Sequence, residues 1–331
     1  MNTDKELEKV ISEIANDYNL TETQKQELIL KMGRLKNTKI NILITGATGC
    51  GKSSTINALF GDNVARVGQG ATPETMDIVR YEHENNIILW DSPGLGDGKE
   101  ADERHTKGII SKLKEKDEEG NALIDLVLVI LDGGSRDLGT SYTLINEVII
   151  PNLGDTKRLL VAINQCDMAM KGRNWNTEKN EPEQPLIDFL DEKVKDIQKR
   201  IKEATNVDIT PIYYSAGYKD GDNEQLPYNL SKLLYFIVSH TKKEKRMVFQ
   251  NRTNKNEKVW EKDDWYQRKS EEFQNEKKEE GGYKKEADKK VKKSFTDRAV
   301  ETIGKVIDFA DKHGDKIIEI GKALWKVFSK K

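Results

Sequence analysis

Residues 46–53 have the composition and spacing of a phosphate-binding loop. They read GATGCGKS, which fits the pattern G-x-x-x-x-G-K-S, and they lie between an apolar run and a helical pattern. In such a loop, backbone N–H groups and the helix dipole bind phosphate oxygens. We expect Lys52 to add positive charge and the Ser53 hydroxyl to bind Mg²⁺. A glycine-rich turn with an exposed lysine is the alternative. The other predicted phosphate contacts are Gly46, Gly49, Gly51 and Ser54.

A second motif, D-x-x-G, ends a later apolar run as Asp91-Ser92-Pro93-Gly94. An aspartate at this position reaches Mg²⁺ through water. The Gly94 N–H can contact a γ-phosphate, whose loss would release the following loop. Alone the motif is weak and also fits a surface turn. Its place one strand after the phosphate loop favours the functional interpretation.

Between these two motifs, residues 70–76 read GATPETM. Hydrolysis of a nucleoside triphosphate at such a site needs a threonine here, whose hydroxyl binds Mg²⁺ and whose backbone holds the attacking water. We predict that Thr75, directly before a strand pattern, has this role. Thr72 is the alternative.

The sequence Asn164-Gln165-Cys166-Asp167 ends another apolar run and predicts which base is bound. A carboxylate at Asp167 can accept hydrogen bonds from guanine N1–H and the 2-amino group, whereas adenine offers neither donor. We assign Asn164 to the same site and expect Ser215 and Ala216 to aim backbone N–H groups at guanine O6. The predicted ligand is therefore GTP or GDP with Mg²⁺. A helix N-cap is the alternative role for Asp167.

Apolar runs alternate with helical patterns through the middle of the chain, which predicts a doubly wound, mostly parallel α/β sheet. The stretch 77–84 alternates and should form an antiparallel hairpin with the next run. The apolar runs are 40–45, 87–90, 126–131, 159–163 and 212–214. The predicted helices are 52–60, 100–116, 137–150, 184–204 and 228–246.

The flanks differ from this α/β domain, which we place at 38–246. Residues 1–37 predict an N-terminal helical hairpin, and 247–293 predict a charged helical or partly disordered connector. Residues 294–331 predict C-terminal amphipathic helices. Within them, 315–330 has one basic and one apolar side, so it predicts either contact with an anionic membrane surface or packing on the hairpin.

The composition sets further limits. A formal net charge of -2 over 331 residues argues against a uniformly basic nucleic-acid binder. The chain has no run of about 18 apolar residues that would span a membrane. Its two cysteines, Cys50 and Cys166, indicate free thiols in a reducing compartment. We expect a cytoplasmic location, with the inner face of the membrane as a peripheral alternative.

With the motifs in this order, residues 38–240 resemble the translation-factor-related class of P-loop GTPases, and within it Era-like bacterial GTPases of the YfjP type. The resemblance implies a Ras-like G domain that hydrolyses GTP to GDP and acts as a nucleotide-controlled switch. A septin- or dynamin-like GTPase that depends on self-association is the alternative. The supporting stretches are GATGCGKSSTINALFG, ATPETMDI, DSPGLG, LDGGSRDLGTSY, NQCD and YYSAG.

Three positions depart from this class. Gly49 stands where potassium-stimulated members carry Asn, so we expect no potassium stimulation. Gln165 replaces the usual Lys, which should weaken nucleotide affinity. Leu95 follows Gly94 where Ras-type enzymes place the water-orienting Gln, so hydrolysis should be slow without a partner.

Two loops at the strand ends are candidates for contacts beyond the nucleotide. Arg136 follows the run 126–131 and could act within the molecule or across a homodimer formed through the nucleotide face. An ion pair with a neighbouring Asp is the alternative. The polar loop 168–185 contains Trp175, either a partner anchor or a residue buried against the domain. Specific nucleic-acid binding is not predicted, because no KH-type G-x-x-G loop follows residue 246.

Overall fold

The computed structural model describes residues 38–61, 64–65, 77–96, 98–220, 223–249 and 252–260. The predicted N-terminal hairpin, the C-terminal helices with the segment 315–330, and most of the charged connector lie outside these residues. Thr72 and Thr75 lie outside them as well.

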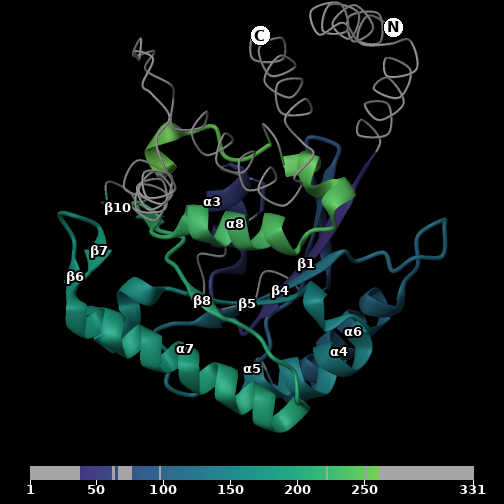
Figure 1. The fold of residues 1–331 in the computed structure, drawn as a ribbon, viewed down its shortest axis with the longest axis horizontal. Helices are drawn as coiled ribbons and strands as arrows, with labels where there is room; N and C mark the ends of the chain where they lie inside the picture. Colours follow the sequence, from purple (N-terminus) through teal and green to yellow (C-terminus); the bar gives the residue numbers. More distant parts are fainter. Residues whose placement is uncertain are drawn as a thin grey trace, which may run out of the picture. The chain divides into compact units, whose positions relative to one another are not determined.

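The described residues form a doubly wound α/β fold around a six-stranded sheet (Figure 1). The strand order is β2-β3-β1-β4-β5-β8, and only β2 runs antiparallel to its neighbour. This confirms the predicted fold class. The strands are β1 Ile40–Gly46, β2 Val79–His83, β3 Ile87–Asp91, β4 Leu126–Asp132, β5 Leu159–Asn164 and β8 Ile212–Tyr213.

The central strands are mostly apolar, as expected where helices cover both faces of a sheet. Figure 1 shows α3 and α8 on one face, and α4, α5, α6 and α7 on the other. The β2–β3 hairpin turns through Glu84 and Asn85, which both have positive φ, as turns of this twist require. The helices are α3 Lys52–Phe60, α4 Lys99–Lys114, α5 Gly139–Thr143, α6 Ile150–Leu153, α7 Gln184–Thr205 and α8 Leu230–His240.

The predicted helix 137–150 is three segments rather than one. A π-helical stretch, Leu144–Ile149, separates α5 from α6, which has Pro151 in its first turn. Proline has no N–H to donate to the preceding turn, so regular α-helical bonding cannot continue through this position. The predicted helical run is therefore confirmed as helical, but it is not α-helical throughout.

The predicted helix 228–246 ends earlier, at His240. Thr241 is extended, and the Arg246 guanidinium donates hydrogen bonds to the carbonyls of Ser239 and Thr241, both at 2.9 Å. Arg246 thus satisfies backbone acceptors at the helix terminus. A separate 3₁₀ segment, Lys243–Phe249, follows.

Packed structure continues past the predicted domain boundary at 246. Phe249 and Trp260 are buried, and the Asn254 side chain donates to the Ala58 carbonyl at 3.1 Å at the end of α3. A further 3₁₀ segment covers Glu257–Trp260. The first part of the predicted connector therefore belongs to the α/β domain, because Asn254 binds carbonyls at the end of α3 and the apolar side chains around it are buried.

The polar loop 168–185 is partly structured. A 3₁₀ segment covers Cys166–Gly172, and β6 Trp175–Asn176 pairs with β7 Glu181–Pro182. Trp175 packs edge-on against Tyr228, with ring centroids 5.4 Å apart. Of the two roles predicted for Trp175, the structure shows packing on the domain. A second small hairpin, β9 Tyr218–Asp220 with β10 Asn223–Gln225, follows β8.

Candidate nucleotide-binding site

The phosphate-binding loop joins β1 to α3, as predicted. Helix α3 begins at Lys52 after Gly51, whose φ of 87° is left-handed, and no side chain caps the helix. Its first turn contains no acidic residue, so the free N–H groups and the dipole favour an anion. Lys52 Nζ lies within the loop, 3.0 Å from the Ala47 carbonyl oxygen.

Gly51 is required here for space as well as for its backbone angle. A side chain at this position would place its Cβ 2.2 Å from Asn164 Nδ2. The loop therefore packs directly against the end of β5. This contact brings the phosphate motif and the base motif together.

Ser53 and Asp91, the two predicted Mg²⁺ residues that the structure describes, are adjacent. Ser53 Oγ donates to Asp91 Oδ2 at 3.2 Å. Asp91 is 1% exposed, and its Oδ1 has no hydrogen-bond partner within the described residues. Burial raises the pKa of Asp91 to about 6, opposed by the positive charge of Lys52 and the hydrogen bond from Ser53. A hydroxyl beside a buried carboxylate with an unpaired oxygen fits Mg²⁺, which takes oxygen ligands.

Asp167 lies in the first turn of the 3₁₀ segment after β5. It is 6% exposed, and its Oδ1 is buried without a hydrogen-bond partner among the described residues. A buried acceptor is costly unless something donates to it. Asp167 thus has the free acceptor that recognition of guanine requires.

Asn164 connects the base and phosphate parts of the site. Its Nδ2 donates to the Cys50 carbonyl at 3.0 Å, and its Oδ1 accepts the Ala216 N–H at 2.9 Å. Its backbone oxygen also accepts the Gly133 N–H at 2.7 Å. Asn164 therefore holds the loops in place, and its polar side-chain atoms already have partners within the chain.

The backbone donors predicted for guanine O6 are also paired within the chain. Ser215 N–H donates to the Tyr228 carbonyl at 3.0 Å, and Ala216 N–H donates to Asn164. The contact of these N–H groups with O6 therefore stays a prediction, since both groups donate within the chain here. The β-bridge between Ser215 and Tyr228 takes up the first donor.

Gln165 has a role that the sequence did not indicate. Its φ is 56°, and its side-chain amide donates to the Gly49 carbonyl at 2.9 Å. The amide thus binds the phosphate loop at a position where related GTPases carry a lysine.

The D-x-x-G loop runs beside the phosphate loop. Leu95 is 5% exposed, its N–H donates to the Gly46 carbonyl at 3.3 Å, and its carbonyl accepts the Thr48 N–H at 3.0 Å. A buried, apolar Leu95 offers nothing to hold a water molecule. Gly94 has no room for a side chain, because a Cβ would lie 2.2 Å from Thr48 Oγ1.

Arg136 is exposed in the loop after β4, at the same sheet edge as the motifs. It forms no ion pair within the described part of the chain, and Asp137 Oδ1 instead accepts the Gly139 N–H at 2.8 Å. Lys193 of α7 holds this loop by donating to the carbonyls of Gly133 and Ser135, both at 2.7 Å. No sequence pattern indicated Lys193.

Cys50 and Cys166 are both fully buried free thiols. Burial raises the pKa of each thiol. The reactive form of cysteine is the thiolate, so both side chains act as packing residues here.

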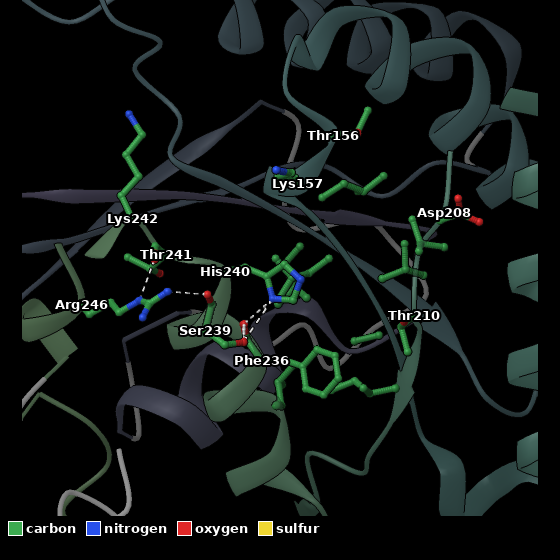
Figure 2. A pocket seen from close by; sticks show the side chains of 18 of the residues that line it. Thr156, Lys157, Asp208, Thr210, Phe236, Ser239, His240, Thr241, Lys242 and Arg246 are labelled. Carbon is green, nitrogen blue, oxygen red and sulfur yellow. Dashed lines mark hydrogen bonds between the residues drawn. The ribbon is translucent and has the colours of Figure 1, made fainter. Parts of the chain in front are cut away.

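A hollow of about 700 Å³ lies elsewhere (Figure 2). It is lined by Leu159 at the amino end of β5, by Phe236 of α8 and by residues around His240. The phosphate and base motifs lie at the opposite, carboxyl ends of the strands. The hollow is therefore separate from the candidate site, and none of its lining residues belongs to a motif.

Fold and site together resemble a P-loop GTPase domain. Residues 41–165 match the family described as 50S ribosome-binding GTPase. This matched segment runs from the strand before the phosphate loop to Gln165.

Curated relatives share the domain over part of their length. The chain is 35% identical over 100 residues to "Translocase of chloroplast 101, chloroplastic" of Physcomitrium patens, covering 30% of this chain and 11% of the relative. It is 30% identical over 206 residues to "tRNA modification GTPase MnmE" of Marinomonas sp., covering 61% and 42%. The chain thus spans less than half the length of these relatives.

A solved structure of Toc33 from Arabidopsis thaliana in complex with GDP and Mg²⁺ is also similar. The two chains are 19% identical with a TM-score of 0.43, covering 70% of this chain and 94% of the other.

Proposed function

We propose that this protein binds GTP and GDP with Mg²⁺ and hydrolyses GTP slowly, as a nucleotide-controlled switch. One observation carries the proposal: two buried carboxylates, Asp91 and Asp167, each keep an oxygen without a partner in the described structure. Asp91 ends β3 and Asp167 follows β5, and these strands end at one sheet edge, beside an uncapped helix N-terminus. A nucleotide with its metal supplies a donor or cation to each oxygen and an anion to the helix.

The proposed metal ligands are Ser53 and Asp91, with Asp91 acting directly or through water. When bound, Mg²⁺ would neutralise negative charge on the β- and γ-phosphate oxygens. Lys52 adds a fixed positive charge to the same phosphates. The protein's own contribution is mainly positioning and electrostatic stabilisation.

Slow turnover follows from Leu95. Ras-type enzymes orient the attacking water with a Gln amide, and Leu95 has no polar side-chain atom. Its backbone is also bonded to Gly46 and Thr48. Efficient hydrolysis would therefore need a group from elsewhere.

Competition binding tests this function. A fluorescent GDP bound to the protein in the presence of Mg²⁺ should be displaced by GTP and GDP, and at least about 100-fold less well by ATP, because adenine cannot donate to Asp167. Phosphate release should then be measured with GTP as substrate. Equal displacement by ATP and GTP would refute the assignment of the base.

Assembly-dependent hydrolysis is a second candidate. Arg136 is exposed at the nucleotide edge, and Lys193 holds the loop that carries it. An arginine supplied by a second copy could stabilise charge in the transition state, as arginine fingers do.

The helices that the structure describes include none with the length and hydropathy of a membrane span.

A further inference from the structure

One face of α4 lies beside the D-x-x-G loop and carries Asp102, His105 and Gly108 at spacings of three residues. Asp102 Oδ1 accepts the Gly96 N–H at 2.9 Å. His105 is 4% exposed, and its Nδ1 lies 3.0 Å from the Gly94 carbonyl oxygen. The helix thus contacts the loop at both sides of Leu95.

The contact between His105 and Gly94 fixes the tautomer of the ring. A carbonyl oxygen only accepts, so Nδ1 of His105 must carry the proton and donate. The Nε2 atom is buried and has no partner among the described residues. The hydrogen bond to Gly94 is therefore the polar contact that orients the imidazole in this structure.

The Gly94–Leu95 peptide is held at both of its polar atoms. Its carbonyl accepts from His105, and its N–H donates to the Gly46 carbonyl in the phosphate loop. Gly94 also packs against Thr48 without space for a side chain. A peptide bonded on both sides cannot rotate without breaking one of these contacts.

The same face of α4 also meets the chain that follows Thr75. A side chain at Gly108 would place its Cβ 3.8 Å from Ile78 Cδ1, an ordinary van der Waals distance. Ile78 packs against the core beside α4. One helix face therefore contacts the D-x-x-G loop and the segment just after residues 70–76.

We propose that His105 is a positioning residue of the nucleotide switch. Its Nδ1–H holds the Gly94–Leu95 peptide in the orientation that presents the neighbouring Gly94 N–H to the γ-phosphate. His105 therefore contributes to the difference between binding GTP and binding GDP, and to hydrolysis. This inference rests on the proposed function, because it concerns the same γ-phosphate.

Two substitutions separate hydrogen bonding from packing. His105→Asn keeps an N–H donor close to the position of Nδ1, whereas His105→Leu fills similar space without a donor. His105→Leu should lower affinity for a non-hydrolysable GTP analogue relative to GDP by about three- to tenfold, the range of one ordinary hydrogen bond. Single-turnover hydrolysis should fall by a similar factor. His105→Asn should stay within about twofold of the unmodified protein.

Leu113→Ala, two turns further along α4, is the matched control for lost helix packing. It should lower the melting temperature while leaving the ratio of analogue to GDP affinity unchanged. Equal ratios in His105→Leu and the unmodified protein, or equal losses in His105→Leu and His105→Asn, would overturn the proposal.

Two further outcomes distinguish the role of His105 from the proposed function. If His105→Leu does not fold, His105→Gln moves the donor to the Nε2 position, and a ratio equal to that of His105→Asn would refute the role of Nδ1. If the unmodified protein binds nucleotide without hydrolysing it, hydrolysis is refuted, and the affinity ratio still tests His105. Absence of any guanine-nucleotide binding would refute both.

Discussion

Asp91 and Asp167 are both nearly inaccessible carboxylates, yet their surroundings differ. Asp91 lies beside Ser53 and the charge of Lys52, and burial still raises its pKa to about 6. Burial is the largest cause of this shift. Asp167 follows β5 and has a free buried oxygen at the other end of the site. These surroundings agree with the proposal that Asp91 binds the metal and Asp167 the base.

Asp167→Asn should change the nucleotide specificity of the protein from GTP to xanthosine triphosphate. The amide can donate to the extra carbonyl of xanthine but can no longer accept both guanine N–H groups. GTP affinity should fall by at least about 100-fold, since hydrogen bonds to a charged group contribute about 1.5–3 kcal/mol each. Competition binding with both nucleotides measures the exchange. Retained preference for GTP would exclude Asp167 as the residue that reads the base.

Lys52→Ala and Ser53→Ala should weaken Mg·GTP binding strongly, by about 100-fold for Lys52 because charged hydrogen bonds to phosphate are lost. Neither side chain belongs to the apolar core, so the far-ultraviolet circular dichroism spectrum should stay unchanged. Calorimetric titration with GTP and excess Mg²⁺ measures the affinity. Tight binding by Lys52→Ala would place the phosphates elsewhere.

At the scale of elements, the strands and the motifs at their ends were predictable from sequence. Unbroken apolar runs such as 126–131 and 159–163 correspond to buried strands, and parallel strands bring their carboxyl ends to one edge. The interruption of the helix at Leu144–Ile149 and the end of α8 at His240 were missed. The latter depends on Arg246 reaching back to helix carbonyls, which has no periodic signal.

Within the site, the sequence predicted residues for ligand binding but missed those that hold the loops. Lys193 and His105 contact backbone carbonyls of loops that lie outside their own helices. Such contacts depend on how helices pack, not on local spacing. The bridge from Ser215 to Tyr228 was also not foreseen, because it joins segments with no shared pattern.

Tyr214 joins the end of β8 to α3, since its hydroxyl lies 2.7 Å from Thr55 Oγ1 and both side chains are buried. Tyr214→Phe should lower the free energy of unfolding by about 1 kcal/mol, the typical contribution of one hydrogen bond. Thr55 keeps its bond to the Gly51 carbonyl, so no orphaned hydroxyl adds to the loss. Guanidinium denaturation measures it. A loss above about 3 kcal/mol would mean that ring packing changes as well.

For the whole molecule, the prediction concerns whether a second copy of the chain accelerates GTP hydrolysis. The isolated protein should hydrolyse GTP at or below about 10⁻⁴ s⁻¹, the intrinsic rate of a Ras-type site. If Arg136 acts in trans, the rate per molecule should rise with protein concentration, and Arg136→Ala should abolish that rise. Arg200→Ala, at an exposed arginine in the last part of α7, is the control. A rate near 1 s⁻¹ in dilute solution would contradict the slow mechanism.

Asn164 gives the site a property that no single contact has. Asn164 forms hydrogen bonds with three loops: the phosphate loop at Cys50, the loop after β8 at Ala216, and the loop after β4 at Gly133. We therefore expect the base and the phosphates of a nucleotide to bind cooperatively, because binding of either part orders the loops that contact the other. Guanosine and inorganic triphosphate, titrated together, should each bind more tightly than alone. Asn164→Ala should make their affinities independent of one another.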